Sequence, residues 1–179
     1  YSPNSDSPIT FIHSYGDWEV EAINSGIARN ALRAFSDFKA SIRRRMSLAM
    51  GYRYRLSVDI ATFYDAIYTH SLSWSICGKE AAKRMFEGID KKNSKYLFAD
   101  QLDKRIRNQK GQETSGVLTG PYTSRIFSEL LLAGIDRDLR ADGFVFRRYV
   151  DDFKFYFRTE SDAQKAIIDI ARILDKYNL

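Results

Sequence analysis

The sequence is poor in residues that cross-link or stiffen a chain, with one cysteine and three prolines among 179 residues. The single cysteine, Cys77, cannot form an internal disulfide and fits a reducing compartment, so we expect a cytoplasmic protein. No apolar run approaches the roughly 20 residues that a membrane-spanning helix needs. The sequence therefore predicts neither a disulfide-rich scaffold nor a membrane partner.

The residues that are present suit one globular domain, because 44% of them are apolar and 14% are aromatic. The net charge of +5 permits a polyanionic partner but does not require one. Basic residues are concentrated in two clusters: Arg43, Arg44, Arg45, Arg53 and Arg55 in the first, and Arg147, Arg148, Lys154 and Arg158 in the second. A solvated surface explains either cluster taken alone.

Hydrophobic periodicity predicts a largely helical segment over residues 17–50 and then a strand within residues 52–64. In this strand apolar and polar residues alternate, which is typical of a strand with one apolar face. A hairpin is predicted to join residues 144–149 to residues 153–158. With helices between and after these strands, the order indicates an α+β fold in which helices pack on one face of an antiparallel sheet.

The pattern also predicts three helices around these strands. One covers residues 73–87, and a second covers residues 121–143. The last begins at Ser161, which forms a capping box with Gln164. Residues 89–112 are polar and predict a connection with short elements. The apolar stripe of the last helix consists of Ala163, Ile167, Ile170 and Leu174.

Two adjacent carboxylates, Asp151 and Asp152, lie at the tip of the predicted hairpin, within the stretch RRYVDDFKFYF. A crowded pair of anions is costly unless it is protonated, paired or bound to cations. Carboxylate oxygens are ligands that Mg²⁺ prefers, and two Mg²⁺ ions about 4 Å apart serve phosphoryl transfer. Asp59, on the polar face of the first strand, is the candidate third carboxylate. An ordinary turn explains the aspartate pair alone, and an ion pair with Arg55 or Arg53 explains Asp59 alone.

Three motifs resemble the polymerase signatures of reverse transcriptases. The stretch YVDD at residues 149–152 resembles the family's tyrosine and two aspartates at a hairpin tip. VDIATFY at residues 58–64 is similar to its first metal-binding segment, and GVLTGPYTSR at residues 116–125 to its glycine loop and the start of the next helix. The motifs occur in the family's order and at roughly its spacing, which is a stronger signal than any one of them.

A longer stretch, FYDAIYTHSLSWSICGK at residues 63–79, is similar to prokaryotic reverse transcriptases of the abortive-infection and defence-associated groups. GPYTSR likewise replaces the Pro-Gln-Gly of retroviral and intron-encoded enzymes, so a contact made by that glutamine is not carried over. The resemblance implies a polymerase palm over residues 51–179, with part of the fingers over residues 1–50. No thumb is expected in this sequence, which looks like a fragment of a longer protein.

The resemblance implies an RNA-directed DNA polymerase, a nucleotidyltransferase that adds dNTP to a primer 3′-OH, acting in prokaryotic antiviral defence. It implies that Asp59, Asp151 and Asp152 are catalytic and hold two Mg²⁺ ions, or Mn²⁺ in their place. The backbone carbonyl of Ile60 would assist one of the ions.

The resemblance also implies residues that contact the nucleotide and the nucleic acid. Tyr64 matches the bulky residue under the sugar, where it would exclude a ribose 2′-OH. Gly120 would allow a base pair to approach the backbone, and Tyr149 would pack near the primer end. The partners are an RNA template, a DNA primer or product, and dNTP, and the oligomeric state stays open. The basic residues expected to contact nucleic acid are Arg43, Arg44, Arg45 and Arg125.

Three alternatives remain open. The same fold could make DNA without a template or from a protein primer. It could also be an RNA-dependent RNA polymerase, which Tyr64 and Tyr149 disfavour, or a catalytically silent palm that only binds nucleic acid. Among the other polar and aromatic residues, His70 is expected to be a hydrogen-bonded structural residue, and Trp18 and Trp74 are expected in the core.

Overall fold

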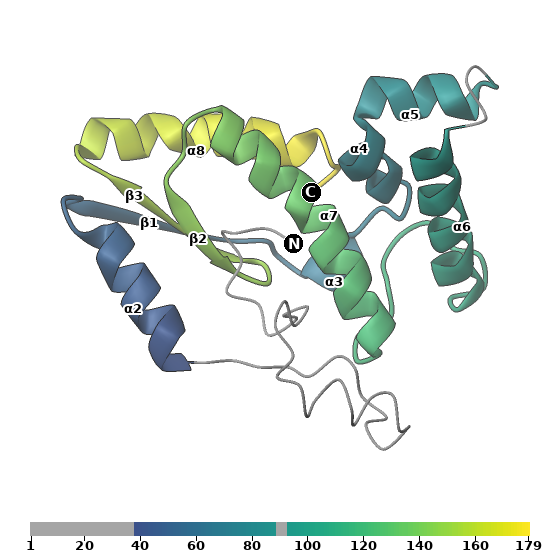
Figure 1. Cartoon of the computed structure of the whole chain (residues 1–179), viewed down its shortest axis with the longest axis horizontal. Coiled ribbons are helices and arrows are strands. Elements are labelled where there is room, and N and C mark those ends of the chain that lie inside the picture. Colours follow the sequence, from purple (N-terminus) through teal and green to yellow (C-terminus); the bar gives the residue numbers. More distant parts are fainter. Residues whose placement is uncertain (1–37, 89–92) are drawn as a thin grey trace, which may run out of the picture.

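The computed structural model describes residues 38–88 and 93–179, and it contains a three-stranded antiparallel sheet at one end of the molecule (Figure 1). The strands are β1 (Tyr54–Asp59), β2 (Phe146–Tyr149) and β3 (Asp152–Phe157), in the order β1-β3-β2. β2 and β3 form the predicted hairpin, and β3 pairs with β1 along its whole length. The prediction of an α+β fold with an antiparallel sheet is confirmed.

The two faces of the sheet differ in polarity, because successive side chains of a strand point to opposite faces. The core face carries the phenylalanine rings of Phe146, Phe153 and Phe155, which are all buried and lie 5.3 to 6.0 Å from one another. Leu56 and Val58 of β1 pack against the same cluster, as their alternation predicts. The other face, here called the polar face, carries Arg55, Ser57, Asp59, Arg147, Tyr149, Asp152, Lys154 and Tyr156.

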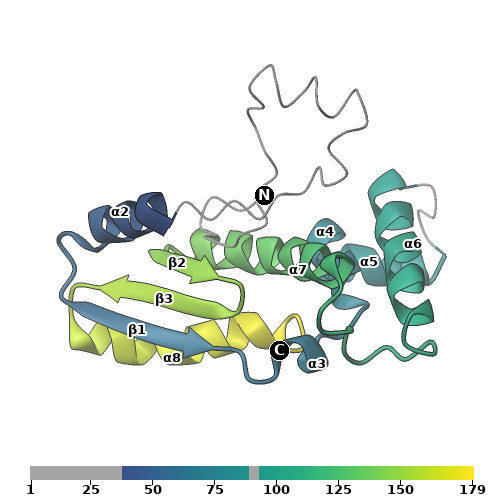
Figure 2. The ribbon, with the colours of Figure 1, turned by 90° about the horizontal axis from the view of Figure 1, so that it is seen from below.

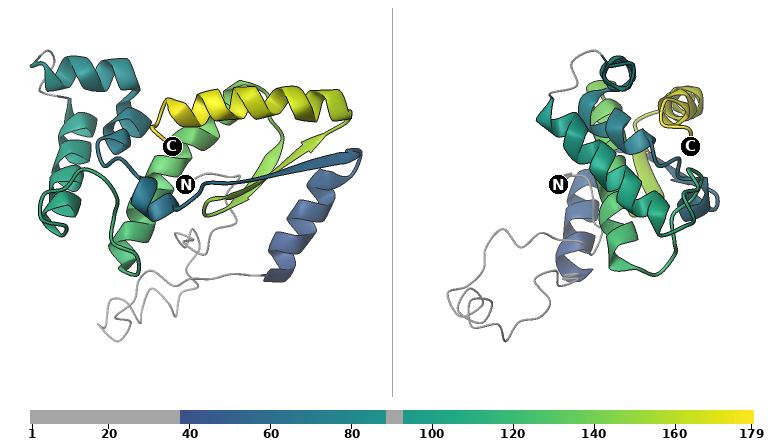
Figure 3. Two further views of the ribbon diagram at one scale, coloured as in Figure 1. Left: turned by 180° about the vertical axis from the view of Figure 1, so that it is seen from behind. Right: turned by 90° about the vertical axis from the view of Figure 1, so that its right-hand side faces the viewer.

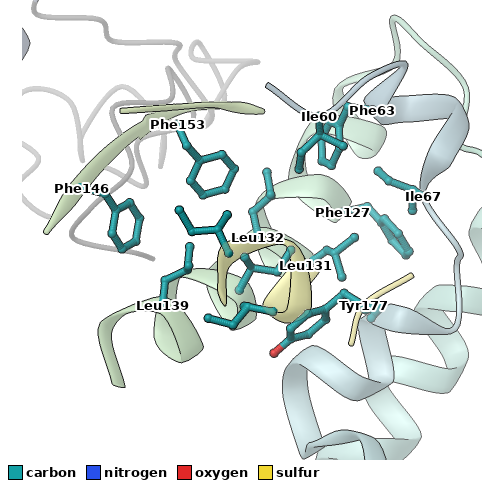
Figure 4. Packing of buried hydrophobic residues seen from close by; sticks show 14 of the residues in the cluster. Ile60, Phe63, Ile67, Phe127, Leu131, Leu132, Leu139, Phe146, Phe153 and Tyr177 are labelled. Atoms are coloured by element: carbon teal, nitrogen blue, oxygen red, sulfur yellow. The ribbon is translucent and has the colours of Figure 1, made fainter. Parts of the chain in front are cut away.

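Two helices, α7 (Tyr122–Ala141) and α8 (Glu160–Asp175), complete the core on one side of the sheet (Figures 1 and 2). Figure 4 shows Leu131 and Leu139 of α7 in the same cluster as Phe146. Full burial of such a side chain stabilises the fold by about 1.5–3 kcal/mol. This cluster is therefore the main support of the hairpin from below.

α8 begins and packs differently from the prediction. Its N-cap is Thr159, whose Oγ1 accepts a hydrogen bond from the Asp162 backbone N–H at 3.1 Å, so the predicted cap at Ser161 is wrong. Ile167 of the predicted stripe is 52% exposed. The predicted stripe and the stripe that is buried in the structure both have the spacing of a helix, and packing against the sheet decides which of the two is buried. The buried stripe consists of Ala166, Ile170 and Ile173, followed by Tyr177.

α2 (Phe38–Ala49) lies on the other side of the sheet from α8, at the end of the strands far from Asp59 (Figure 2). Of residues 1–50, predicted as part of the fingers, only 38–50 are described, and there α2 confirms the helical prediction. Tyr156 is on the polar face yet only 7% exposed, because α2 and the loop after it lie over that position. The predicted arrangement, with helices on one face alone, is therefore incomplete.

Four further helices continue beyond the sheet (Figure 3): α3 (Phe63–Ala66), α4 (Ser71–Cys77), α5 (Lys79–Phe86) and α6 (Ser94–Asn108). α4 packs closely on α7, where a Cβ added at Gly134 would lie 2.8 Å from the Ser75 Cα. The Ser75 hydroxyl donates to the Leu130 carbonyl of α7 at 2.9 Å. Within the described part of the chain, no helix is long and apolar enough to cross a membrane.

Two predictions for this helical end are wrong. The predicted helix over residues 73–87 is divided into α4 and α5, because Gly78 adopts a φ of 86° that ends one helix before the next begins. The predicted connection over residues 89–112 contains α6, which is 15 residues long. Asn93 caps α6 by accepting a hydrogen bond from the Tyr96 backbone N–H at 3.2 Å. The charged residues of α6 hide its narrow buried side in the sequence.

Candidate active site

Asp59 and Asp152 occupy directly opposed positions at one end of the sheet. Asp59 is the last residue of β1, Asp152 is the first of β3, and the two are antiparallel partners on the polar face. Side chains of such partners have Cβ atoms about 4.5–5.5 Å apart. Asp151 precedes Asp152 in the turn of the hairpin. The structure thus brings the three carboxylates predicted from the sequence to the same end of the sheet.

The turn that carries Asp151 is tight and strained. Tyr149 pairs with Asp152, so only Val150 and Asp151 connect the two strands. Val150 has a φ of 53°, a conformation that is rare for a β-branched residue and is usually left to glycine in two-residue hairpins. Such a residue costs about 1–3 kcal/mol and persists only where its surroundings hold it.

Arg148 lies beneath this turn and holds it from the core side. Its Nη1 donates to the Val150 carbonyl at 2.9 Å and to Glu129 Oε1 at 2.9 Å. Its Nη2 donates to Asp136 Oδ2 at 2.8 Å, and its Nε donates to Asp136 Oδ1 at 3.0 Å. Glu129 and Asp136 belong to α7, so the network ties the strained turn to that helix.

The buried network was missed by the sequence analysis, which grouped Arg148 with basic residues on the surface. The Arg148 side chain is fully buried and is not available to a phosphate. Burial alone would lower the pKa of Arg148, but the charges and hydrogen bonds of Asp136 and Glu129 raise it above its ordinary value. The strand alternation contains the signal, since Arg148 has the same parity as Phe146 on β2 and therefore points to the core.

The three carboxylates at this end of the sheet are electrostatically crowded. The pKa of Asp151 is raised, first by partial burial and then by the negative charges of Asp59 and Asp152. A backbone hydrogen bond and the charge of Arg148 oppose this rise. Asp152 has a cationic partner, because Lys154 Nζ lies 2.9 Å from its Oδ2. The Asp59 carboxylate has no ion pair or side-chain hydrogen bond with another described residue.

The carboxylates fit a divalent cation by donor type and by position, because hard cations take oxygen ligands. Across residues 38–88 and 93–179, however, no three His, Cys, Asp or Glu side chains are arranged as a ready metal cage. Asp152 would have to exchange Lys154 for the ion. Mg²⁺ or Mn²⁺ at Asp59, Asp151 and Asp152 therefore stays a prediction.

The predicted sugar-contacting segment and the predicted glycine loop lie side by side. The Val117 N–H donates to the Tyr64 carbonyl at 2.8 Å, and the Gly116 N–H donates to the Ile67 carbonyl at 2.7 Å. Gly116 has a φ of 76°, and a Cβ there would lie 3.2 Å from the Asp65 carbonyl oxygen, so only glycine fits. Tyr64 is half-buried, with its ring 5.4 Å from that of Phe63.

The remaining predicted site residues have different surroundings. Ile60 is buried directly after β1, and Tyr149 is 48% exposed on the polar face opposite Asp152. Gly120 has a φ of 114° with no atom within 4 Å of an added Cβ, so its surroundings are open. Arg125, in the first turn of α7, stacks on the Tyr122 ring at 6.0 Å. The predicted contacts of these residues with nucleotide or primer stay predictions.

The arginines of α2 do not act as one group. Arg43 and Arg44 are exposed, whereas Arg45 is half-buried and its Nε atom has no hydrogen-bond partner. All three are far along the strands from Asp59, at the end where α2 lies (Figure 2). Their predicted contact with nucleic acid therefore does not place them beside the carboxylates.

His70 is hydrogen-bonded, as predicted. Its Nδ1 lies 3.0 Å from Oδ2 of the buried Asp103, which also accepts a hydrogen bond from Arg107 Nε at 3.2 Å. Burial by itself raises the pKa of Asp103, but hydrogen bonds and charges, chiefly from His70, reverse this and lower it. A cavity of about 510 Å³ between α4, α5 and α6 is lined by His70 and Trp74 and contains none of the predicted site residues. Trp74 is only half-buried, and Trp18 lies outside the described residues.

A comparison with known protein families and with curated proteins found no match for this chain. The class that fold and site define is an α+β domain with three carboxylates gathered at one end of an antiparallel sheet. What the domain does is therefore inferred from these residues and their placement.

Proposed function

We propose that this chain is the catalytic palm of an RNA-directed DNA polymerase, a reverse transcriptase most similar to those of prokaryotic antiviral defence, acting in the cytoplasm. The observation that carries the proposal is the pairing of Asp59 with Asp152 across β1 and β3, with Asp151 next to them in the strained turn. Two carboxylate motifs that are 92 residues apart in the sequence (59 to 151) thereby reach one end of one sheet.

In this proposal Asp59, Asp151 and Asp152 bind two Mg²⁺ ions, and the Ile60 carbonyl assists one of them. When bound, the ions would activate the primer 3′-OH and neutralise charge on the phosphates. The three aspartates supply the anionic oxygens that hold the ions. Their crowding, which raises the pKa of Asp151, favours a cation at this position.

Nucleotide and nucleic acid would lie on the polar face, which none of the core helices covers. Tyr64 would occupy the space that a ribose 2′-OH needs, and Tyr149 would contact the primer end. Gly120 leaves open space beside the start of α7, where a base pair would approach. The partners are an RNA template, a DNA primer or product, and dNTP.

A palm that binds nucleic acid without catalysis is the second candidate. The ion pair between Lys154 and Asp152 favours it, because a lysine already neutralises one of the three carboxylates. The two candidates differ in one requirement, since catalysis needs the lysine to give way to a metal ion and simple binding does not.

The test is to incubate the purified protein with all four dNTPs and Mg²⁺, with and without an RNA template and DNA primer, and to sequence the product. Template-complementary DNA supports the proposal. DNA of a sequence unrelated to the template would indicate template-independent or protein-primed synthesis. A product in a parallel reaction with rNTPs in place of dNTPs would indicate an RNA polymerase. The Asp59→Asn variant serves as the control for contaminating polymerase. No product from the wild type would favour the silent palm.

A further inference from the structure

α2 and the polar face of the sheet enclose a cavity of about 400 Å³ whose lining is strongly basic. No aspartate or glutamate of the described residues lines it. Its apolar part comes from Ile42, Met46 and Ala49 of α2, and three tyrosines complete the wall: Tyr52, Tyr54 and Tyr156. The cations that line it are Arg45, Arg53, Arg55 and Lys154.

Among the residues that the structure describes, no carboxylate of the lining compensates these positive charges. Like charges gathered in one concave site repel, and the field they produce concentrates anions there. Arg45 adds a specific sign, because its Nε is buried without a hydrogen-bond partner, and a buried donor that is left unpaired destabilises the fold. Lys154 has an acidic partner, but that partner is Asp152 of the carboxylate site. An anion with several acceptor oxygens would relieve both the repulsion and the unpaired donor.

We infer that this cavity binds a backbone phosphate of a nucleic-acid strand. Arginine and lysine around one concave site are the residues that bind phosphate, since the guanidinium matches its oxygens in pairs. The three tyrosines add ring faces and hydroxyl donors that suit a sugar–phosphate chain. A free nucleotide carries the same phosphate chemistry as a nucleic-acid strand. The position of the cavity relative to the carboxylates distinguishes these two ligands.

The position favours a strand over a free nucleotide. On the polar face Arg55 lies four residues before Asp59, which is about 13 Å along a strand at 3.3 Å per residue. At 3.4 Å per nucleotide along each strand of a duplex, this is roughly four nucleotides. A strand that ends at the carboxylates would thus bring a phosphate over the cavity a few nucleotides back. The placement of the strand end at the carboxylates rests on the proposed function, whereas phosphate binding in the cavity does not.

The test measures binding and requires no catalysis. Fluorescence anisotropy of a labelled oligodeoxythymidine is recorded against salt concentration for the wild type, Arg53→Gln, Arg55→Gln and the double variant. Both arginines are exposed, so the fold should survive. The slope of the logarithm of the binding constant against the logarithm of salt concentration should become shallower by about 0.7 for each lost phosphate contact. It should therefore be shallower by about 1.4 in the double variant, and all three variants should bind more weakly than the wild type. Arg105→Gln, at an exposed position of α6, removes the same charge elsewhere and is the matched control.

Binding of dTTP is measured in parallel. If both arginine variants bind the oligonucleotide as Arg105→Gln does, or if the wild type binds none, the cavity holds no strand and the inference is overturned. If the arginine variants bind dTTP more weakly but bind the oligonucleotide as the wild type does, the cavity binds a free nucleotide and the inference of a bound strand is overturned. A protein that makes no DNA but loses oligonucleotide binding in these variants would disprove the polymerase and leave the phosphate site standing.

Discussion

Beneath the β2–β3 hairpin, Arg148, Asp136 and Glu129 form a buried network in which the guanidinium spreads its hydrogen bonds over two carboxylates and a carbonyl. Above the same hairpin lie the three carboxylates of Asp59, Asp151 and Asp152, and the ion pair that the described residues form with them is that of Lys154 with Asp152. The two groups are separated by the thickness of one strand, because successive residues of a strand point to opposite faces.

The two groups of charges have different roles. The buried network around Arg148 stabilises the fold, whereas the three carboxylates are presented to solvent, where a ligand can reach them. Below the hairpin, the hydrogen bonds of Arg148 tie the turn to α7, so the network specifies shape. Above it, the strained Val150 presents Asp151 beside two other anions, an arrangement that costs free energy in the absence of a cation. Groups held at such a cost are candidates for function.

Removal of one upper carboxylate should have the largest effect on activity and little effect on the fold. Asp151→Asn should reduce nucleotide incorporation by at least about 10²-fold, the loss expected when a group that stabilises the transition state is removed. The measurement is primer extension with dNTP and Mg²⁺. A variant that extends primers at the wild-type rate would show that Asp151 has no catalytic role.

The same variant gives a pH test of the crowding. Because the pKa of Asp151 is raised in the folded protein, the folded state holds its proton more tightly than the unfolded state. Without metal, the wild type should therefore lose stability as pH rises from the unfolded pKa of Asp151 to its folded pKa. Asp151→Asn should lack this loss and be equally or slightly more stable at neutral pH. Parallel curves of unfolding free energy against pH would mean that Asp151 is not crowded.

Disruption of the lower network should have the opposite profile, a large loss of stability. Arg148→Met leaves two buried carboxylates without their cation and should cost about 3–5 kcal/mol of unfolding free energy. Arg148→Lys keeps the charge but loses the planar fork, so we expect a smaller loss. Arg158→Met, at an exposed position just after β3, is the control and should stay within about 0.5 kcal/mol. Denaturant unfolding measures all three, and equal stability of Arg148→Met and Arg158→Met would contradict the tie to the turn.

Tyr64 should affect the choice of sugar more than stability. Its ring would exclude a 2′-hydroxyl by volume, so Tyr64→Phe should keep the preference for dNTP over rNTP. Tyr64→Ala should admit rNTP, and because the ring is only half-buried we expect a cost of about 1–3 kcal/mol, below that of a fully buried ring. The ratio of kcat/KM for dNTP and rNTP checks this. An unchanged ratio in Tyr64→Ala would make Tyr64 a packing residue.

The sequence predicts the strands and the hairpin of this site better than it predicts how these elements pair and pack with one another. The alternation of Leu56 and Val58 and the hairpin around residues 151 and 152 follow from local patterns. The register that pairs Asp59 with Asp152 is not local, since it depends on how β1 docks on β3. In the sequence, Arg148 resembles a surface charge because two aspartates follow it closely. Its side chain is buried because it lies on the core face of β2 and because carboxylates of α7 pair with it.

The helical end shows the same limit. Gly78 lies within a helical period, so the break between α4 and α5 depends on a backbone conformation that the pattern does not contain. α6 carries many charged residues, and the contact of its narrow buried side with α4 decides that it is a helix. Long-range packing, rather than propensity, sets these elements.

The most direct test of the central claim, that the upper carboxylates bind a divalent cation together, is a titration with Mn²⁺ followed by electron paramagnetic resonance in the absence of nucleotide. The wild type should bind Mn²⁺, while Asp59→Asn and Asp152→Asn should each lose most of that binding, although the two residues are on different strands. Asp175→Asn, an exposed carboxylate at the end of α8, controls for the change of charge and should bind as the wild type does. Absence of Mn²⁺ binding in the wild type, or equal binding in all four proteins, would contradict the claim.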